Sequence, residues 1–221
     1  RWDAHAHPRL RAELQRLIAA AQPDVVCFEH VECVGLIEGL ACDVPVVWTL
    51  HDAGRALPPA AQARVGAALT HVTALVLSTA ADLGYWQHPH EILVENGVRV
   101  PDVAAAPSPQ DGPLLLVAPL RYRPNLDGLR DFLERAWPAL RANDPSLRLR
   151  VLAGDGGASR WGAAPLPAGV ELVDGHVDPA PEYAAATLAL NPQGEIEGSA
   201  LKLAEALAHG RMMVSTRSGA R

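Results

Sequence analysis

One segment of the sequence combines carboxylates, a lysine and small residues at a spacing that suits a ligand site. In "PQGEIEGSALKLAEALAHG" (192–210), Glu197 and Glu205 are eight residues apart, and Lys202 lies between them. The small residues that precede the helical stretch and leave backbone N–H groups accessible are Gly198, Ser199 and Ala200. A helix N-terminus offers unpaired donors and a partial positive charge, so a diphosphate could bind there with a carboxylate on either side to take hydroxyl groups.

The same spacing also has a structural interpretation, which the spacing alone favours. Glu197 would then stabilise the helix dipole, and Glu205 would be a solvated surface residue.

His51 is the second candidate for chemistry. It ends the apolar run "PVVWTL" (45–50) and precedes Asp52. Ligands of open parallel sheets gather beyond the carboxyl ends of the strands, so we expect His51 to project into a cleft rather than a core. A lone histidine after a strand is otherwise more often a structural hydrogen-bonding residue. The other histidines lack the spacing of a metal site, and we expect no metal.

The elements that must position these residues alternate between strands and helices. Short β-branched apolar runs with amphipathic stretches between them predict parallel strands with crossover helices on both faces. The predicted strands are 24–28, 45–50, 74–78, 91–95, 113–118, 147–153, 170–174, 187–191 and 212–216. The predicted helices are 8–21, 59–70, 125–143, 181–186 and 199–209, the last closed by Gly210.

The clearest break in this alternation is "VPDVAAAPSPQDGP" (100–113), whose prolines and small residues resemble a semi-rigid linker. We therefore predict an N-terminal Rossmann-like domain over 1–106 and a C-terminal one over 107–221. The chain begins without methionine and stops at "STRSGAR", so we expect both domains to be incomplete at the chain ends.

The charge and composition of the sequence argue against some classes of binding partner. A formal charge of -6 without a run of like charges argues against nucleic acid or an anionic membrane as the main partner. No apolar stretch is long enough to span a bilayer. Cys27, Cys33 and Cys42 lack metal-site spacing and are predicted to be reduced core thiols, which favours the cytoplasm.

Several landmarks together resemble a known family. "EGSALKLAEALAHGRMMVST" (197–216) resembles the E-x7-E signature of the retaining glycosyltransferases of family 4 (glycosyltransferase group 1), which have the GT-B fold. The segments 120–156 and 170–192 resemble their donor-domain strands and helices. "PVVWTLHD" (45–52), "LVLS" (75–78) and "ILVENGV" (92–98) match their N-terminal landmarks in the right order. The resemblance implies two Rossmann-like domains with parallel sheets that face a cleft.

The resemblance also implies roles for individual residues. Glu197 would bind the donor sugar's hydroxyls, Glu205 would accept hydrogen bonds from the ribose, and His51 would contact the sugar near the reacting carbon. The backbone of Gly198, Ser199, Ala200 and Leu201 would hold the diphosphate. Family members are usually metal-independent, so cationic side chains and N–H donors must meet the departing charge.

The sequence departs from the family at that cationic site. Family members usually carry an Arg and a Lys after the first donor-domain strand, whereas the aligned positions here hold Pro119 and Asn125. Arg121, Arg123 and Lys202 are the candidate substitutes.

The implied function is retaining transfer of a hexose from a UDP- or GDP-linked donor to a glycan or lipid-linked acceptor, in the bacterial cytoplasm or at the inner face of the membrane. The nucleotide sugar would be a co-substrate, and no cofactor is expected. Two alternatives remain: a nucleotide-sugar-binding pseudo-enzyme, and a sugar-nucleotide epimerase of similar architecture. The absence of G-x-G-x-x-G after any strand argues against a dinucleotide-dependent oxidoreductase.

Overall fold

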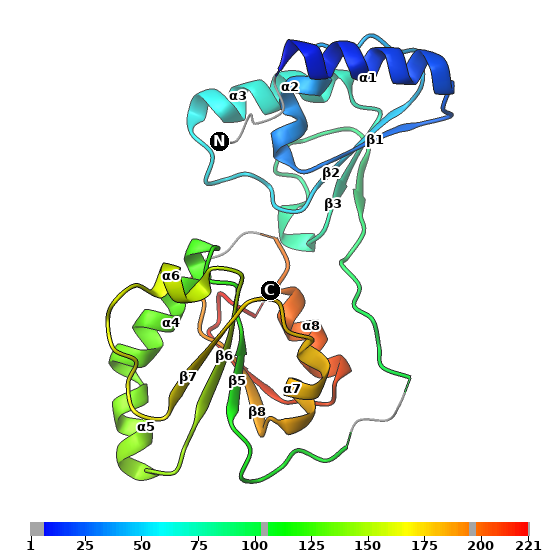
Figure 1. Ribbon diagram of the computed structural model, residues 1–221. Helices are drawn as coiled ribbons and strands as arrows, with labels where there is room; N and C mark the ends of the chain where they lie inside the picture. The colour runs from blue at the N-terminus through cyan, green and yellow to red at the C-terminus, as the bar shows by residue number, and fades with distance from the viewer. Residues whose placement is uncertain (1–6, 103–105, 195–197, 221) are drawn as a thin grey trace. The chain divides into compact units, whose positions relative to one another are not determined.

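The computed structural model describes residues 7–102, 106–194 and 198–220, which form two compact α/β units (Figure 1). Of the described residues, the first unit comprises 7–96 with 198 and 199, and the second comprises 97–102, 106–194 and 200–220. No helix of the described residues is long and apolar enough to cross a membrane.

The first unit is built on a four-stranded parallel sheet in the order β1-β2-β3-β4. Its strands are β1 (Val26–Glu29), β2 (Val46–Leu50), β3 (Ala74–Leu77) and β4 (Glu91–Leu93). Its helices are α1 (Pro8–Ala21), α2 (Val34–Ile37) and α3 (Pro59–Ala68), with 3-10 turns at 31–33, 69–71 and 80–82. Alternate residues of β2 are buried, and Trp48 is completely enclosed in the core of this unit.

The second unit is built on a five-stranded parallel sheet in the order β7-β6-β5-β8-β9. Its strands are β5 (Leu114–Val117), β6 (Leu149–Gly154), β7 (Val170–Asp174), β8 (Leu188–Asn191) and β9 (Met213–Ser215). Its helices are α4 (Arg123–Arg135), α5 (Trp137–Asn143), α6 (Gly157–Trp161), α7 (Pro179–Ala185) and α8 (Leu201–Ala208).

Helices cover both faces of this second sheet. Leu114 and Leu116 of β5 pack with α4 and α5, whereas Leu115, between them, packs with Tyr183 of α7 and Ala206 of α8. Successive side chains of a strand point to opposite faces, so β5 contributes to both cores. This confirms the predicted parallel sheets with crossover helices.

All nine predicted strands are present, and α1 has the predicted bounds. The single helix predicted over 125–143 is wrong, because Ala136 separates α4 from α5. Pro138 stands at the start of α5, where its missing N–H and fixed ring prevent the first helix from continuing through it. The short helices α2 and α6 were not predicted.

The units divide between Asn96 and Gly97, N-terminal to the predicted boundary at 106/107. Arg211, which is 1% exposed, forms hydrogen bonds that hold part of the proline-rich segment against the rest of the second unit. Its guanidinium donates to the carbonyl oxygen of Ala106 at 2.8 Å and to those of Tyr183 and Ala184 at the end of α7. These carbonyls satisfy a buried cation at the negative end of a helix dipole.

Candidate functional site

The strand order of the second unit defines where a ligand is expected. β5 lies between β6 and β8, so the connections that leave β5 and β8 run to opposite faces of the sheet and leave a crevice between them. Gly128 of α4 lets the loop after β8 come close, because a Cβ atom there would lie 2.6 Å from the carbonyl oxygen of Pro192. Residues that follow β5 and β8 are thereby brought into contact.

Asn125 is the centre of a buried polar network at this crevice. Its amide nitrogen donates to the carbonyl oxygen of Pro119 at 3.0 Å, and its amide oxygen accepts from Gln193. The Lys202 ammonium donates to the same oxygen at 2.7 Å. Pro119 and Asn125 are the two positions where the family pattern would have its cations. The Lys202 side chain from α8 is thus hydrogen-bonded to the residue at one of these two positions, Asn125.

Lys202 is a partly buried cation that has no acidic partner among the described residues. It is the single lysine of the sequence, and burial lowers its pKa to about 8. Within the described ranges it forms no salt bridge, and its only hydrogen-bond acceptor is the neutral amide of Asn125. A desolvated ammonium at the start of α8, near the positive end of the helix dipole, favours an anionic ligand.

The two arginines predicted as substitutes are placed differently. Arg121 and Arg123 are both exposed. The Arg123 guanidinium donates to Asp127 at 2.7 Å on the same helix, and this hydrogen bond raises the pKa of Arg123. Of the three candidate cations, Lys202 alone belongs to the Asn125 network in the described structure.

Glu205 lies one turn further along α8 and is held by an aromatic pair. The Tyr183 hydroxyl donates to the Glu205 carboxylate at 3.2 Å, and the Tyr183 ring stacks on His209 at 4.9 Å between centroids. Tyr183 is completely buried, and its pKa is raised by burial first and then by the charge of Glu205. The tyrosine is therefore a fixed donor that orients one carboxylate oxygen.

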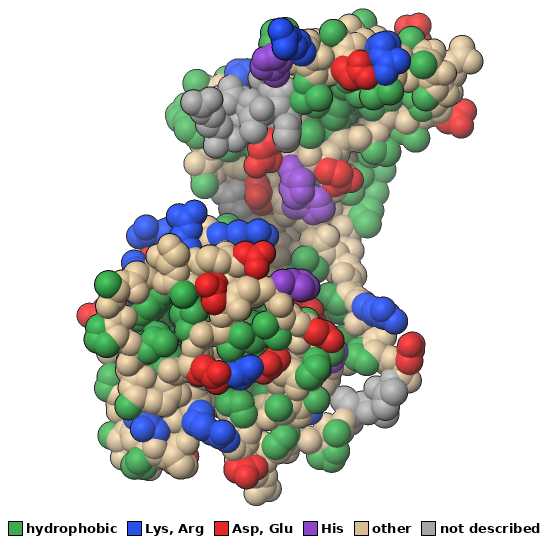
Figure 2. Space-filling model, in the orientation of Figure 1, with side chains coloured by type: hydrophobic (Ala, Val, Ile, Leu, Met, Phe, Trp, Pro, Cys, Tyr) green, Lys and Arg blue, Asp and Glu red, His purple; other side chains and the backbone are tan. Residues whose placement is uncertain are grey.

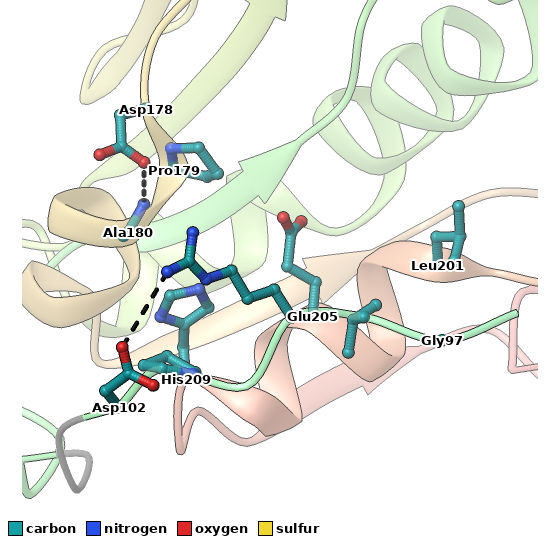
Figure 3. Close-up of a pocket in the computed structure, with 11 residues that line it drawn as sticks. Gly97, Asp102, Asp178, Pro179, Ala180, Leu201, Glu205 and His209 are labelled. Atoms are coloured by element: carbon teal, nitrogen blue, oxygen red, sulfur yellow. Dashed lines mark hydrogen bonds and ion pairs between the residues drawn. The ribbon is translucent and has the colours of Figure 1, made fainter.

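Glu205 and His209 project into a pocket of the second unit of about 660 Å³ (Figure 3). Leu201 lines it from α8, and Asp178, Pro179 and Ala180 line it from the start of α7. The remaining lining residues are Gly97, Val98, Arg99, Pro101 and Asp102. The Asp178 carboxylate accepts from the N–H of Ala180 at 3.1 Å as the cap of α7. The volume suits a nucleotide-sized ligand.

The residues that lead into α8 are only partly described. Glu197 lies outside the described residues. Gly198 has φ 71°, a backbone conformation that glycine adopts readily, and Ser199 and Ala200 follow it into the helix. Leu201 is half exposed at the first position of α8.

His51 follows β2 in the first unit, as predicted, and has a carboxylate partner that the sequence did not indicate. Its Nε2 lies 2.9 Å from the Glu29 carboxylate, and its ring centroid lies 4.4 Å from that of His30. Its carbonyl oxygen accepts from the buried Ser78 hydroxyl at 2.8 Å. Histidine and acidic side chains gather on this part of the first unit's surface (Figure 2). Throughout the described ranges, no three or more His, Cys, Asp or Glu side chains are grouped to hold a metal ion.

The predicted cysteine state is correct in part. Cys27, Cys33 and Cys42 are all free thiols, but Cys27 is exposed rather than part of the core. It occupies an outward-facing position of β1, whose burial alternates along the strand.

Comparison with known proteins agrees with this architecture. Residues 113–221 match the family described as Glycosyl transferases group 1. No curated protein matches the chain significantly.

Among solved structures, the chain is similar to TarM of S. aureus, crystallised with fondaparinux, alpha-GlcNAc-glycerol and UDP. The TM-score is 0.71 at 11% identity, over 93% of this chain and 44% of TarM. It is similar to Anabaena HepE in complex with UDP and glucose, with TM-score 0.66 and 16% identity, over 98% of this chain and 66% of that one. The UDP-forming trehalose-phosphate synthase of Burkholderia xenovorans, in complex with glucose-6-phosphate, gives TM-score 0.71 at 13% identity, over 95% and 63%.

At these identities the structural likeness establishes the fold, and the chain spans less than half the length of TarM. The chain therefore has the GT-B fold, and its residues 113–221 match the family described as Glycosyl transferases group 1.

Proposed function

We propose that this chain carries the donor-binding part of a glycosyltransferase that uses a nucleotide-diphosphate sugar. The observation that carries the proposal is the Lys202 ammonium, which is desolvated at the start of α8 and hydrogen-bonded to Asn125 without a described carboxylate partner. A diphosphate supplies the negative charge that this position lacks.

In the proposed complex the diphosphate is bound by Lys202 and by the backbone at the start of α8. Glu205, oriented by Tyr183, accepts hydrogen bonds from the ribose hydroxyls in the adjacent pocket. The similar structures of TarM and HepE are both complexes with UDP, which supports a uridine nucleotide here. GDP is the other candidate.

Catalysis in this proposal depends on stabilising the leaving nucleotide diphosphate. Charge develops on the phosphate as the bond to the sugar breaks, and a preorganised cation in a partly desolvated site lowers that barrier. His51 and Glu197 are proposed to contact the donor sugar, with Arg121 and Arg123 as secondary phosphate contacts. No metal is needed in this scheme.

We infer membership of the retaining family 4, a hexose as the transferred group, and a glycan or lipid-linked acceptor. We place the reaction in the bacterial cytoplasm or on the inner face of its membrane. These rest on the family resemblance of the sequence.

The test is calorimetric titration of the complete protein with UDP and GDP, beside the variants Lys202→Met and Glu205→Gln. We expect one nucleotide to bind, Lys202→Met to weaken it by ~100-fold, and Glu205→Gln to weaken it by ~10-fold. Arg130→Met, which removes an exposed cation of α4, is the control and should leave affinity unchanged. Unchanged affinity in Lys202→Met would exclude the lysine from the phosphate site.

A turnover assay separates the proposal from its two alternatives. A transferase releases free nucleotide from the donor when acceptor is present. A pseudo-enzyme binds nucleotide without turnover, and an epimerase converts the sugar while nucleotide and sugar stay joined.

A further inference from the structure

Three side chains that can exchange or share protons meet at one end of the first sheet. Glu29 is the last residue of β1, His30 follows it, and His51 follows β2. β1 and β2 are parallel neighbours, with Glu29 opposite Thr49. The carboxyl ends of both strands therefore lie together, which brings Glu29 within 2.9 Å of His51 Nε2.

His30 is held in a conformation that is costly for a residue with a side chain. Its φ is 67° and its ψ is 156°, a region that only glycine adopts freely. Two contacts keep it there: its N–H donates to the carbonyl oxygen of Thr49, and its own carbonyl oxygen accepts from the fully buried Trp48 indole at 2.9 Å. This backbone turn is what brings the His30 ring against His51, with 4.4 Å between centroids.

The contact with Glu29 determines which nitrogen of the His51 ring carries the proton. A carboxylate accepts hydrogen bonds, so the nitrogen that faces it, Nε2, carries the proton. In the neutral ring Nδ1 is then an acceptor, and no described group satisfies it. The His51 side chain is 36% exposed and that of Glu29 56%, so a ligand can reach the pair.

We infer that Glu29 and His30 are positioning residues for His51: Glu29 fixes the proton on Nε2, His30 restricts the ring, and Nδ1 is presented to accept a hydrogen bond from a sugar hydroxyl. The inference rests on the proposed function for the identity of the ligand. The arrangement of Glu29, His30 and His51 stands on the first unit alone.

An exposed carboxylate–imidazole pair contributes little to folding, because solvent screens it. A contribution to stability therefore does not explain why the carboxylate lies against the imidazole. Positioning of the imidazole does, since a ring that must present one defined nitrogen has to be prevented from rotating.

The first experiment measures the tautomer of His51 directly. Two-bond ¹H–¹⁵N correlation spectra of the complete protein, at a pH where the ring is neutral, should show only the Nε2–H form. In Glu29→Leu both forms should appear, and Glu29→Gln, which keeps an acceptor oxygen, should restore the single form. Glu13→Leu is the matched control, since Glu13 is a comparably exposed carboxylate, 51%, of the same unit. An unchanged tautomer pattern in Glu29→Leu overturns the inference.

The second experiment measures turnover of the donor. Glu29→Leu should lower kcat by ~10-fold with the nucleotide Kd unchanged, and Glu29→Gln should recover part of the loss. A kcat equal to that of the Glu13→Leu control also overturns the inference. If no donor is turned over by the wild type, the proposed function fails, while the spectra still decide whether Glu29 positions His51.

Discussion

The two units present their candidate chemistry in opposite environments. In the second unit Lys202 is desolvated and hydrogen-bonded to a buried amide, so its electrostatics are set by burial. In the first unit His51 and Glu29 are exposed, so their geometry is set by a hydrogen bond, a ring contact and a strained turn. Changes at the first kind of site should alter stability and ligand affinity. Changes at the second should alter turnover with little effect on either.

The second unit holds another buried cation, Arg211. Lys202 has one neutral acceptor, whereas Arg211 donates to several carbonyl oxygens. Arg211→Met should therefore destabilise the protein by about 3 kcal/mol or more, because the carbonyls of Tyr183 and Ala184 lose their donor in the interior. Urea denaturation measures the loss. Arg130→Met, at an exposed position, should stay within about 0.5 kcal/mol of wild type.

The exposed site is tested by His51→Ala. We expect turnover to fall by ~10²-fold or more, with a modest loss of UDP or GDP affinity and no loss of thermal stability. Steady-state kinetics and calorimetry on the same preparation separate the two effects. Wild-type turnover would remove His51 from the site and leave the first unit without an assigned role.

Lys202→Met should stabilise the fold at neutral pH, by on the order of 2 kcal/mol, while it weakens diphosphate binding. The folded-state pKa of Lys202, about 8, lies below the usual lysine value of 10.5. Between these two values the unfolded chain binds more protons, so wild-type stability rises with pH relative to the variant. The advantage of Lys202→Met should be complete below pH 8 and vanish toward pH 10.5. Denaturation at pH 7 and pH 10 checks this, and an equal difference at both would show that the lysine is not desolvated.

Tyr183→Phe removes the donor to Glu205 and keeps the ring that stacks on His209. We expect UDP affinity to fall by ~5-fold and 2′-deoxy-UDP affinity to fall less, because only the ribose contact depends on the orientation of Glu205. Equal losses for both nucleotides would place the effect outside the ribose site.

His30→Gly should change the stability of the protein only slightly. Relief of the positive φ should raise stability by about 1 kcal/mol, offset in part by the greater freedom of glycine in the unfolded chain. Thermal denaturation detects the difference, and His90→Gly, which lacks a positive φ, should not be stabilised.

The sequence predicted the strands of both sheets because each is a short apolar run between polar or proline-containing segments. It did not predict the break between α4 and α5, since the helical periodicity passes through Ala136 and only Pro138 marks the interruption. The spacing of Lys202 and Glu205 on one helix was visible in the sequence. The hydrogen bonds of Lys202 with Asn125 and of Glu205 with Tyr183 were not visible in it.

The side-chain contacts that the sequence did not predict depend on which strands are neighbours in a sheet. The Lys202–Asn125 hydrogen bond joins residues 77 positions apart and exists because β5 and β8 are neighbours in the sheet. The Glu29–His51 contact likewise depends on the pairing of β1 with β2. A positive φ at His30 has no signal in the residue type, because the hydrogen bonds with Thr49 and Trp48 that hold it join residues far apart in the sequence.

The lowered pKa of Lys202 also affects its reactivity. An amine reacts with acylating reagents in its neutral form, and a pKa of about 8 makes that form available near physiological pH. Since the sequence contains no other lysine, the proposed donor site holds the only ε-amine of the chain. Acetylation of this one residue, by a reagent or by an enzyme, would remove the cation and close the site to phosphate, and a bound nucleotide would protect it.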